Sequence, residues 1–214
     1  MNGLIKKDLL TIWKKNSSFS LLLMIGGIVL LVYRQSGVGI MMVSIFILPL
    51  FGSFEHFELS VADDKWKWDK YAIALPLTKS DIVRSRFYIC GAVVLIMFIL
   101  SLVLNIGAAL VLNQFSLYVH IVFSVLGFLV GVLFMCIAIP CGYKFRLQGA
   151  SVTAVLTMLI TGGGVTALAV FDFDVFDITA VQFAIIAVCV TVLSAMLIWV
   201  SLKISTFFYA MKYR

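Results

Sequence analysis

Three side chains that are able to bind a metal ion lie close together in the sequence: Glu55, His56 and Glu58. Two carboxylates and one imidazole supply at most three ligands, and the other histidine, His120, is predicted on the opposite membrane face. We therefore predict no metal site. Two interpretations remain open: either these residues form a cytoplasmic gate or salt bridges to Lys and Arg of neighbouring helices, or they are solvated charges at a helix end.

A second acidic group, made of Asp172, Asp174 and Asp177, alternates with phenylalanines between residues 171 and 177. It resembles half of a calcium-binding loop, but the required glycine and the closing glutamate are missing. In one interpretation the segment is a short interfacial loop whose Phe side chains face lipid and whose Asp side chains face water. In the other, the carboxylates form an extracellular acidic mouth that attracts cationic peptides.

Motifs for catalysis or for an energy source are absent from the sequence. No Gly-x-x-x-x-Gly-Lys-Ser/Thr phosphate loop is present, and Gly162, Gly163 and Gly164 lie in an apolar run, which favours close helix packing. The serine hydrolase and zinc protease motifs are also missing. The predicted membrane spans have no Asp, Glu, Lys or Arg in their cores, so no site for a coupling ion is predicted. The chain is not expected to be an enzyme, and energy for any transport must come from another protein.

The elements that would position these residues are membrane helices. Hydrophobic residues make up 63% of the 214 residues and charged residues only 12%, which is too little polar surface to cover a water-soluble protein. Because backbone groups inside a bilayer must be paired there, a spanning chain forms helices or a closed barrel, and the long unbroken apolar runs predict helices. We predict an all-α polytopic membrane protein with one permease domain over residues 1–214. Its six predicted spans are residues 17–33, 38–58, 87–112, 120–141, 149–171 and 180–203.

The distribution of positive charge predicts the orientation in the membrane. With these spans, 15 of the 16 Lys and Arg residues fall on one side, and Arg34 alone falls on the other. Positively charged short loops stay in the cytoplasm, so both termini are predicted there, in a multi-pass protein of the cytoplasmic (inner or plasma) membrane. The net charge of +6 is explained by this topology and by attraction to anionic lipid, without nucleic acid as a partner.

The N-terminal segment 1–16 is predicted to be an interfacial amphipathic helix. Its apolar positions recur at helical spacing and its lysines form the polar face; they are Leu4, Ile5, Leu9, Ile12 and Trp13, and Lys6, Lys7, Lys14 and Lys15. The helix either anchors the first span or also contacts a cytoplasmic partner.

The cytoplasmic loop 61–86 is rich in aromatic residues. One apolar stripe, made of Trp68, Tyr71, Ala72 and Leu75, is predicted on a short helix that Pro76 ends. The segment from Thr78 to Asp81 is then predicted to be a capping box for a new helix that enters the membrane near Phe87. The stripe is either an interfacial aromatic belt or a docking surface for a soluble partner.

Two stretches of the sequence are similar to one known family. The first contains Asp64-Lys65, Trp68-Asp69-Lys70-Tyr71, Leu75-Pro76-Leu77-Thr78, Ile82-Val83 and Arg86, and the second is Tyr143-Lys144-Phe145 after Pro140. They resemble the type-2 ABC exporter permeases, six-span subunits linked to peptide and antibiotic export and immunity, and among them the phenol-soluble-modulin exporter permeases. One departure is Arg146, which stands where the family commonly has glycine.

The resemblance implies a function and a set of partners. In such permeases the first cytoplasmic loop contains a coupling helix that sits in a groove of a separate ATPase subunit. By this analogy the coupling residues are Trp66, Trp68, Tyr71, Leu75 and Pro76. The chain itself would hold no cofactor, since ATP and magnesium bind to the partner. A second permease, identical or homologous, would complete a transporter for amphipathic or hydrophobic peptides, in toxin export, immunity or antimicrobial peptide resistance. The alternative is a six-helix substrate-binding module or scaffold without a translocation path of its own.

Overall fold

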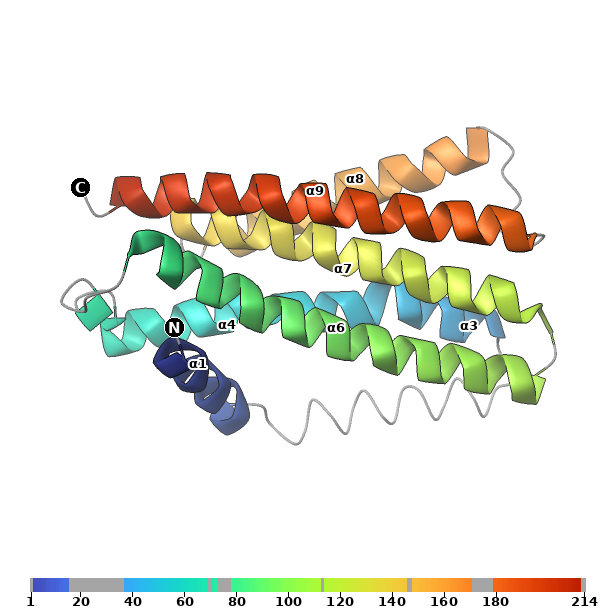
Figure 1. Cartoon of the computed structure of the whole chain (residues 1–214), viewed down its shortest axis with the longest axis horizontal. Coiled ribbons are helices and arrows are strands. Elements are labelled where there is room, and N and C mark those ends of the chain that lie inside the picture. Colours follow the sequence, from blue (N-terminus) through green and yellow to red (C-terminus); the bar gives the residue numbers. More distant parts are fainter. Residues whose placement is uncertain are drawn as a thin grey trace.

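The computed structural model describes residues 2–15, 37–68, 71–72, 78–112, 114–145, 148–170 and 179–212. In these ranges the regular structure is helical and no strand occurs, which confirms the all-α prediction. The elements are α1 (Asn2–Lys15), α3 (Gly37–Met42), the π-helix η1 (Val43–Ile47), α4 (Leu48–Trp66), α6 (Lys79–Leu112), α7 (Leu117–Phe145), α8 (Gly149–Val170) and α9 (Ala180–Lys212). The long helices run side by side along one axis, and α1 lies obliquely against one end (Figure 1).

Three helices among the described residues are long and apolar enough to cross a membrane: Lys79–Leu112, Leu117–Phe145 and Ala180–Met211. They contain the third, fourth and sixth predicted spans. The second and fifth predicted spans correspond to α3 through α4 and to α8, which include the shorter apolar helices Gly37–Ile47 and Gly149–Gly164. The first predicted span, residues 17–33, lies outside the described residues. The total of six spans therefore stays a prediction.

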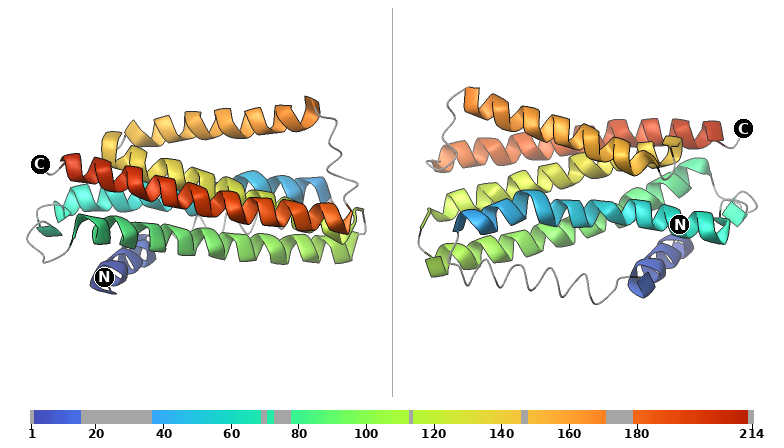
Figure 2. Two further views of the ribbon diagram at one scale, coloured as in Figure 1. Left: turned by 45° about the horizontal axis from the view of Figure 1, so that its top comes forward. Right: turned by 180° about the vertical axis from the view of Figure 1, so that it is seen from behind.

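Helix α7 forms the centre of the bundle and packs against α4, α6, α8 and α9 (Figures 1 and 2). Its main hydrophobic core contains residues of α6, α7 and α9: Val83, Phe87, Cys90, Val94, Val132, Met135, Cys136, Ile139 and Tyr209. The π-helix η1 lies close to α7, because a Cβ atom at Gly127 would stand 2.2 Å from the backbone oxygen of Ser44. Only glycine permits this approach of two backbones.

A network of polar side chains is buried between η1, α6 and α7. The Asn105 side-chain amide donates to Ser44 Oγ and, at 3.0 Å, to the Ser101 carbonyl oxygen; its own oxygen lies 3.3 Å from Nδ1 of His120. The Ser101 hydroxyl donates to Ser124 Oγ at 3.1 Å. Such bonds satisfy buried polar groups, and they join the helices in the way small polar residues join membrane helices. The network lies in the half of the bundle whose described residues carry no charge.

Helix α8 contacts α7 near its start and then diverges from the other helices (Figure 2). Its exposed apolar residues include Val155, Met158 and Leu159, which are 58%, 73% and 67% exposed. Within the described part of the chain no helix packs closely on Gly162 to Gly164, since no atom there lies within 4 Å of a Cβ placed on any of these glycines. The divergence of α8 leaves these small residues open.

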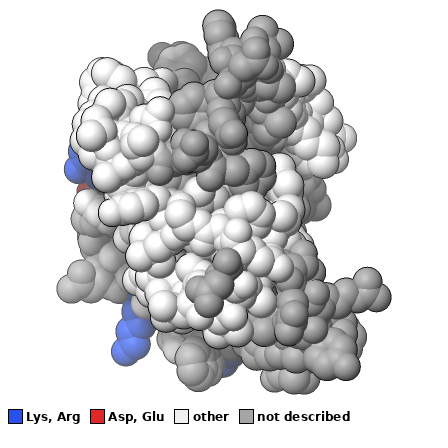
Figure 3. Space-filling model, turned by 90° about the vertical axis from the view of Figure 1, so that its right-hand side faces the viewer, with Lys and Arg blue, Asp and Glu red and all other residues white. Residues whose placement is uncertain are grey.

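Among the described residues, charged side chains are confined to one end of the bundle, which we call the basic end. It contains α1, the C-terminal ends of α4, α7 and α9, and the start of α6 (Figure 1). The described residues of the other half include no Asp, Glu, Lys or Arg, and most of the described atoms seen from that side in Figure 3 belong to uncharged residues. Positively charged short loops stay in the cytoplasm, so the basic end is the one expected to face it.

Candidate functional site

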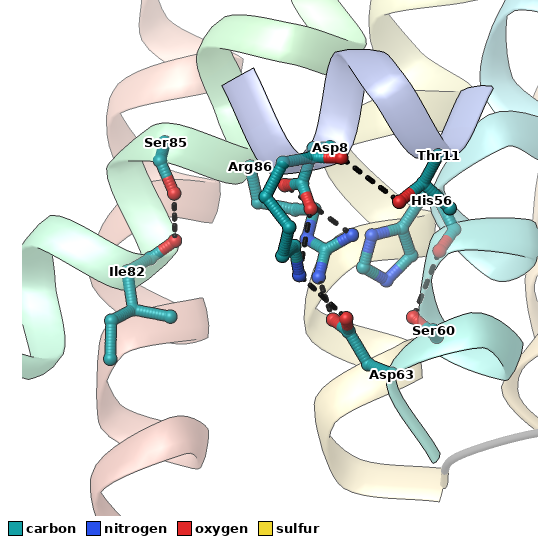
Figure 4. Close-up of polar contacts among 9 residues, drawn as sticks. Asp8, Thr11, His56, Ser60, Asp63, Ile82, Ser85 and Arg86 are labelled. Carbon is teal, nitrogen blue, oxygen red and sulfur yellow. Dashed lines mark hydrogen bonds and ion pairs between the residues drawn. The ribbon is translucent and has the colours of Figure 1, made fainter. Parts of the chain in front are cut away.

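Four charged side chains from α1, α4 and α6 meet at the basic end, and we call them the charged junction: Lys7, Asp8, Asp63 and Arg86. Arg86 Nη2 donates to Asp63 Oδ2, and Arg86 Nη1 lies 3.7 Å from Asp8 Oδ2. Lys7 Nζ donates to Asp63 Oδ1 at 2.6 Å and lies 2.9 Å from Asp8 Oδ1. Figure 4 shows the two carboxylates on either side of the Arg86 guanidinium. Two cations and two anions thus hold three helices together.

Burial makes this junction sensitive to change. Asp8 is 3% exposed and Arg86 is 7% exposed, so both have lost most of their hydration. Charges in such surroundings are tolerated only when they are paired, and removal of one partner leaves an uncompensated buried charge. The junction therefore fixes α1 and the end of α4 against the start of α6.

Sequence reasoning did not find the charged junction. Arg86 entered only as one of the cytoplasmic positive charges and as a residue of the family resemblance, and neither Asp8 nor Asp63 was singled out. A usable signal was present: an arginine directly before a long apolar run must find a carboxylate partner or remain at the surface. The sequence offered no means of choosing among the carboxylates, because Asp8 lies 78 positions away.

The predicted gate residues differ in burial. The side chain of His56 is 1% exposed and is packed between α4 and α7, where its ring lies 5.9 Å from that of Tyr143. A Cβ atom at Gly142 would stand 2.3 Å from His56 Nε2, so glycine is required for this packing. Glu58 is exposed and Glu55 is half-buried; the three side chains therefore differ in environment. Their role as a gate stays a prediction.

No group of three or more His, Cys, Asp or Glu in the described ranges is placed so that it could hold a metal ion. His56 lies beside Gly142 near one end of α7, whereas His120 lies near the other. The 22 positions between residues 120 and 142 of α7 correspond to about 33 Å of helix. The two imidazoles are therefore far too distant to share an ion.

A cavity of about 870 Å³ lies between α1 and α4 at the basic end, and we call it the α1–α4 cavity. It is lined by four residues of α1, by the last turns of α4 and by two aromatic residues that follow: Lys7, Leu10, Thr11, Lys14, Val61, Ala62, Asp63, Lys65, Trp66, Trp68 and Tyr71. Lys7 Nζ lies 4.3 Å from the ring centroid of Trp68, a cation–π contact. Lys7 and Asp63 belong to both the cavity and the charged junction.

Three of the predicted coupling residues line this cavity. Trp66 is 73% exposed and Tyr71 is 64% exposed, whereas Trp68 is half-buried. Helix α4 ends at Trp66 because Lys67 takes a left-handed conformation with φ 50°. Trp66 therefore belongs to α4 and not to a separate coupling helix. The remaining predicted coupling residues, Leu75 and Pro76, lie outside the described residues.

The predicted capping box at the start of α6 is confirmed. The Asp81 backbone N–H donates to Thr78 Oγ1 at 3.2 Å, and the Thr78 backbone N–H donates to Asp81 Oδ2 at 3.2 Å. The Thr78 hydroxyl also donates to Asp81 Oδ2 at 2.6 Å. These hydrogen bonds to the carboxylate, first the side-chain one and then the backbone one, hold the pKa of Asp81 below its ordinary value. They fix the start of α6 at Lys79, eight positions before the apolar span begins at Phe87.

The N-terminal segment is helical as predicted. Leu4 and Asp8, one helical turn apart, are buried, whereas Leu9 is 52% exposed. The position of this helix at the membrane interface stays a prediction. The acidic mouth predicted at Asp172, Asp174 and Asp177 lies outside the described residues, as does Arg34, and both stay predictions.

The comparison with family models identifies the chain. The model for the ABC-2 family transporter protein matches residues 3–210, which is nearly the whole chain. No curated protein and no solved structure matches it. The long apolar helices agree with this family, whose members are membrane permease components of ABC transporters and not ATPases. The chain therefore belongs to the ABC-2 family of transporter proteins, as a multi-pass permease.

Proposed function

We propose that this chain is the membrane-spanning subunit of an ATP-driven exporter, in which two permease chains combine with two separate ATPase subunits to move amphipathic or hydrophobic peptides. The observation that carries the proposal is the α1–α4 cavity. It combines exposed aromatic side chains with lysines at the end of the bundle that is expected to face the cytoplasm. ATP and magnesium would bind to the partner ATPase.

The lining of the cavity suits a protein partner. Tryptophan and tyrosine are enriched among the residues that dominate binding energy at protein interfaces, because they bury a large area at a low entropic cost. Trp66 and Tyr71 are mostly exposed in the isolated chain, so a partner would bury them. Lys14 and Lys65 line the same cavity and favour a partner helix with acidic side chains.

The charged junction connects the α1–α4 cavity to the long helix α6. Asp63 lies in the wall of the cavity and binds Arg86, which stands at the start of the long helix α6. A partner that moves the end of α4 therefore also acts on α1 and α6 through buried ion pairs. We infer that the junction couples movement of the ATPase to the spans.

The second permease would pack on α8. Its apolar face is exposed in the single chain, and Gly162, Gly163 and Gly164 have open space beside them among the described residues. Small residues let two membrane helices approach closely. This face supports a permease dimer, and a path for peptides between the two chains would follow from it.

The proposal is tested by purification of the tagged chain from its native host, with identification of stoichiometric partners by mass spectrometry. The wild type is expected to bring down a separate ATPase at about one copy per permease. Simultaneous Trp66→Ala and Tyr71→Ala substitution is expected to weaken this association by at least about tenfold, because truncation of such anchors typically costs about 2 kcal/mol each.

The matched control is Trp199→Ala on α9, which removes an indole that is 66% exposed and lies outside the cavity. It should leave the association unchanged. Full association of the double variant would show that the ATPase docks elsewhere. If the wild type brings down no ATPase under conditions that preserve known complexes, the chain acts instead as a substrate-binding module or scaffold.

A further inference from the structure

A second cavity, of about 490 Å³, opens between α6, α7 and α9, and we call it the α6–α9 groove. In Figure 1, α6 and α9 flank α7 on the side that faces the viewer. Apolar residues of all three helices line the groove, among them Leu95, Met135 and Ile198. Arg84 is the one charged residue among those that line it. The groove is thus apolar along its length and cationic at the basic end.

The length of the groove matches one leaflet of a bilayer. On α6 it extends from Arg84 to Leu95, which are 95 − 84 = 11 positions apart. At 1.5 Å per residue this is about 16 Å, close to half of the roughly 30 Å hydrocarbon core of a membrane. With the basic end at the cytoplasmic surface, Arg84 lies at the depth of the lipid headgroups and Leu95 near the bilayer midplane.

The groove is open to the outside among the described residues. Tyr88 is 60% exposed and Leu95 is 51% exposed. No described atom lies within 4 Å of a Cβ placed on Gly91, which lies between them on α6. The absence of a side chain at Gly91 therefore leaves room for a chain-like apolar group to lie against α6.

We propose that the α6–α9 groove binds one anionic phospholipid of the inner leaflet, with its phosphate at Arg84 and an acyl chain along Gly91 toward Leu95. A guanidinium group binds phosphate oxygens through two parallel N–H donors. These charge-assisted hydrogen bonds are stronger than hydrogen bonds to a neutral group. The Asp81 carboxylate also lies within electrostatic reach of Arg84, but its Oδ2 already accepts hydrogen bonds from the backbone N–H and the hydroxyl of Thr78. Tyr88 lies one helical turn from Arg84, at the membrane–water interface, where tyrosines are enriched.

A second copy of this chain is a poorer occupant of the groove. Two copies with the same membrane orientation would be related by an axis along the membrane normal, so a symmetric contact through this groove would pair residues that lie at the same depth. It would bring the Arg84 side chains of both copies to the same end of one interface, and the residues that line the groove include no acidic side chain. An anionic lipid removes this charge conflict.

The test uses the full chain, purified in detergent and exchanged with phosphatidylglycerol or with phosphatidylcholine of the same acyl chains. Native mass spectrometry then counts the lipids retained on each chain, and thermal melting measures their stabilising effect. The wild type is expected to retain one phosphatidylglycerol and to be stabilised more by it than by phosphatidylcholine. Arg84→Gln should reduce this preference about fivefold, the usual effect of one basic side chain near an anionic lipid. Gly91→Leu should block retention of either lipid.

Two control variants separate the groove from general membrane effects. Lys6→Gln removes an exposed cation of α1 that lines neither cavity, and Gly107→Leu adds a side chain to an open position of α6 that does not line the groove. Both should behave as the wild type, and all variants should melt normally in phosphatidylcholine. Equal retention of the two lipids by the wild type, or unchanged retention by Arg84→Gln and Gly91→Leu, would overturn the proposal. So would efficient disulfide formation between two Leu95→Cys chains, since a second copy would then occupy the groove.

Discussion

Asp63→Asn is the most informative single change at the charged junction. It removes the carboxylate that accepts from Arg86 Nη2 and leaves the guanidinium with Asp8 at 3.7 Å as its remaining acidic neighbour in the junction. Loss of one partner of a buried ion pair typically costs about 3 to 5 kcal/mol. Since Asp63 retains 18% side-chain exposure, we expect a decrease in the free energy of unfolding at the lower limit, about 3 kcal/mol. For a chain of this size that corresponds to a fall in melting temperature of about 6 to 12 °C.

The assay is thermal melting of the detergent-solubilised chain, followed by size-exclusion chromatography with fluorescence detection. Addition of Arg86→Met to Asp63→Asn provides the decisive comparison. The double variant removes one positive and one negative charge, and the remaining Lys7 and Asp8 lie 2.9 Å apart as a pair. Most of the lost stability should therefore return.

Asp64→Asn is the matched control, because this neighbouring carboxylate is exposed and lies outside the junction. It should leave the melting temperature within about 1 to 2 °C, as surface substitutions usually do. The reasoning is refuted if Asp63→Asn melts like the control, or if the double variant is no more stable than Asp63→Asn alone.

Two other predictions concern packing and capping. Gly142→Ala should lower the free energy of unfolding by about 1 to 3 kcal/mol, because the new methyl group would overlap the buried His56 ring. The control Gly107→Ala, at an open position of α6, should not lower it. Equal melting temperatures of the two variants would contradict this packing. Asp81 has a lowered pKa in the folded chain, so its contribution to stability is complete above about pH 4 and is lost as the pH falls through the lowered value. The difference in melting temperature between the wild type and Asp81→Asn should therefore be constant above about pH 4 and shrink below it; a difference that grows on acidification would argue against the capping role.

The apolar runs predicted the helices well but not their lengths. The third, fourth and sixth predicted spans lie within α6, α7 and α9, yet each of these helices extends beyond its apolar run at the basic end. Hydropathy measures which residues prefer lipid, whereas a helix continues for as long as its backbone and side chains find partners. The capping box at Thr78, a local signal, predicted the true start of α6.

Contacts between distant segments were the part that the sequence could not predict. The pairing of Asp8 with Arg86 depends on how α1 lies against α6, and no local pattern encodes that angle. The close approach of Ser44 to Gly127 depends likewise on the path of η1, which widens the helix just before Pro49. Proline lacks the N–H for a regular helical bond, but the sequence alone does not say whether the helix kinks, ends or widens there.

The charged junction also imposes an order on the synthesis of this protein. Chains emerge and begin to fold from the N-terminus, so Asp8 leaves the ribosome 78 residues before Arg86. Until the start of α6 has emerged, Asp8 and Asp63 have Lys7 but not the arginine that holds α1, α4 and α6 together. Docking of α1 through Arg86 therefore waits until the start of α6 has emerged. A ribosome stalled before residue 86 would hold a nascent permease whose first helix has been synthesised but is not yet docked against α6.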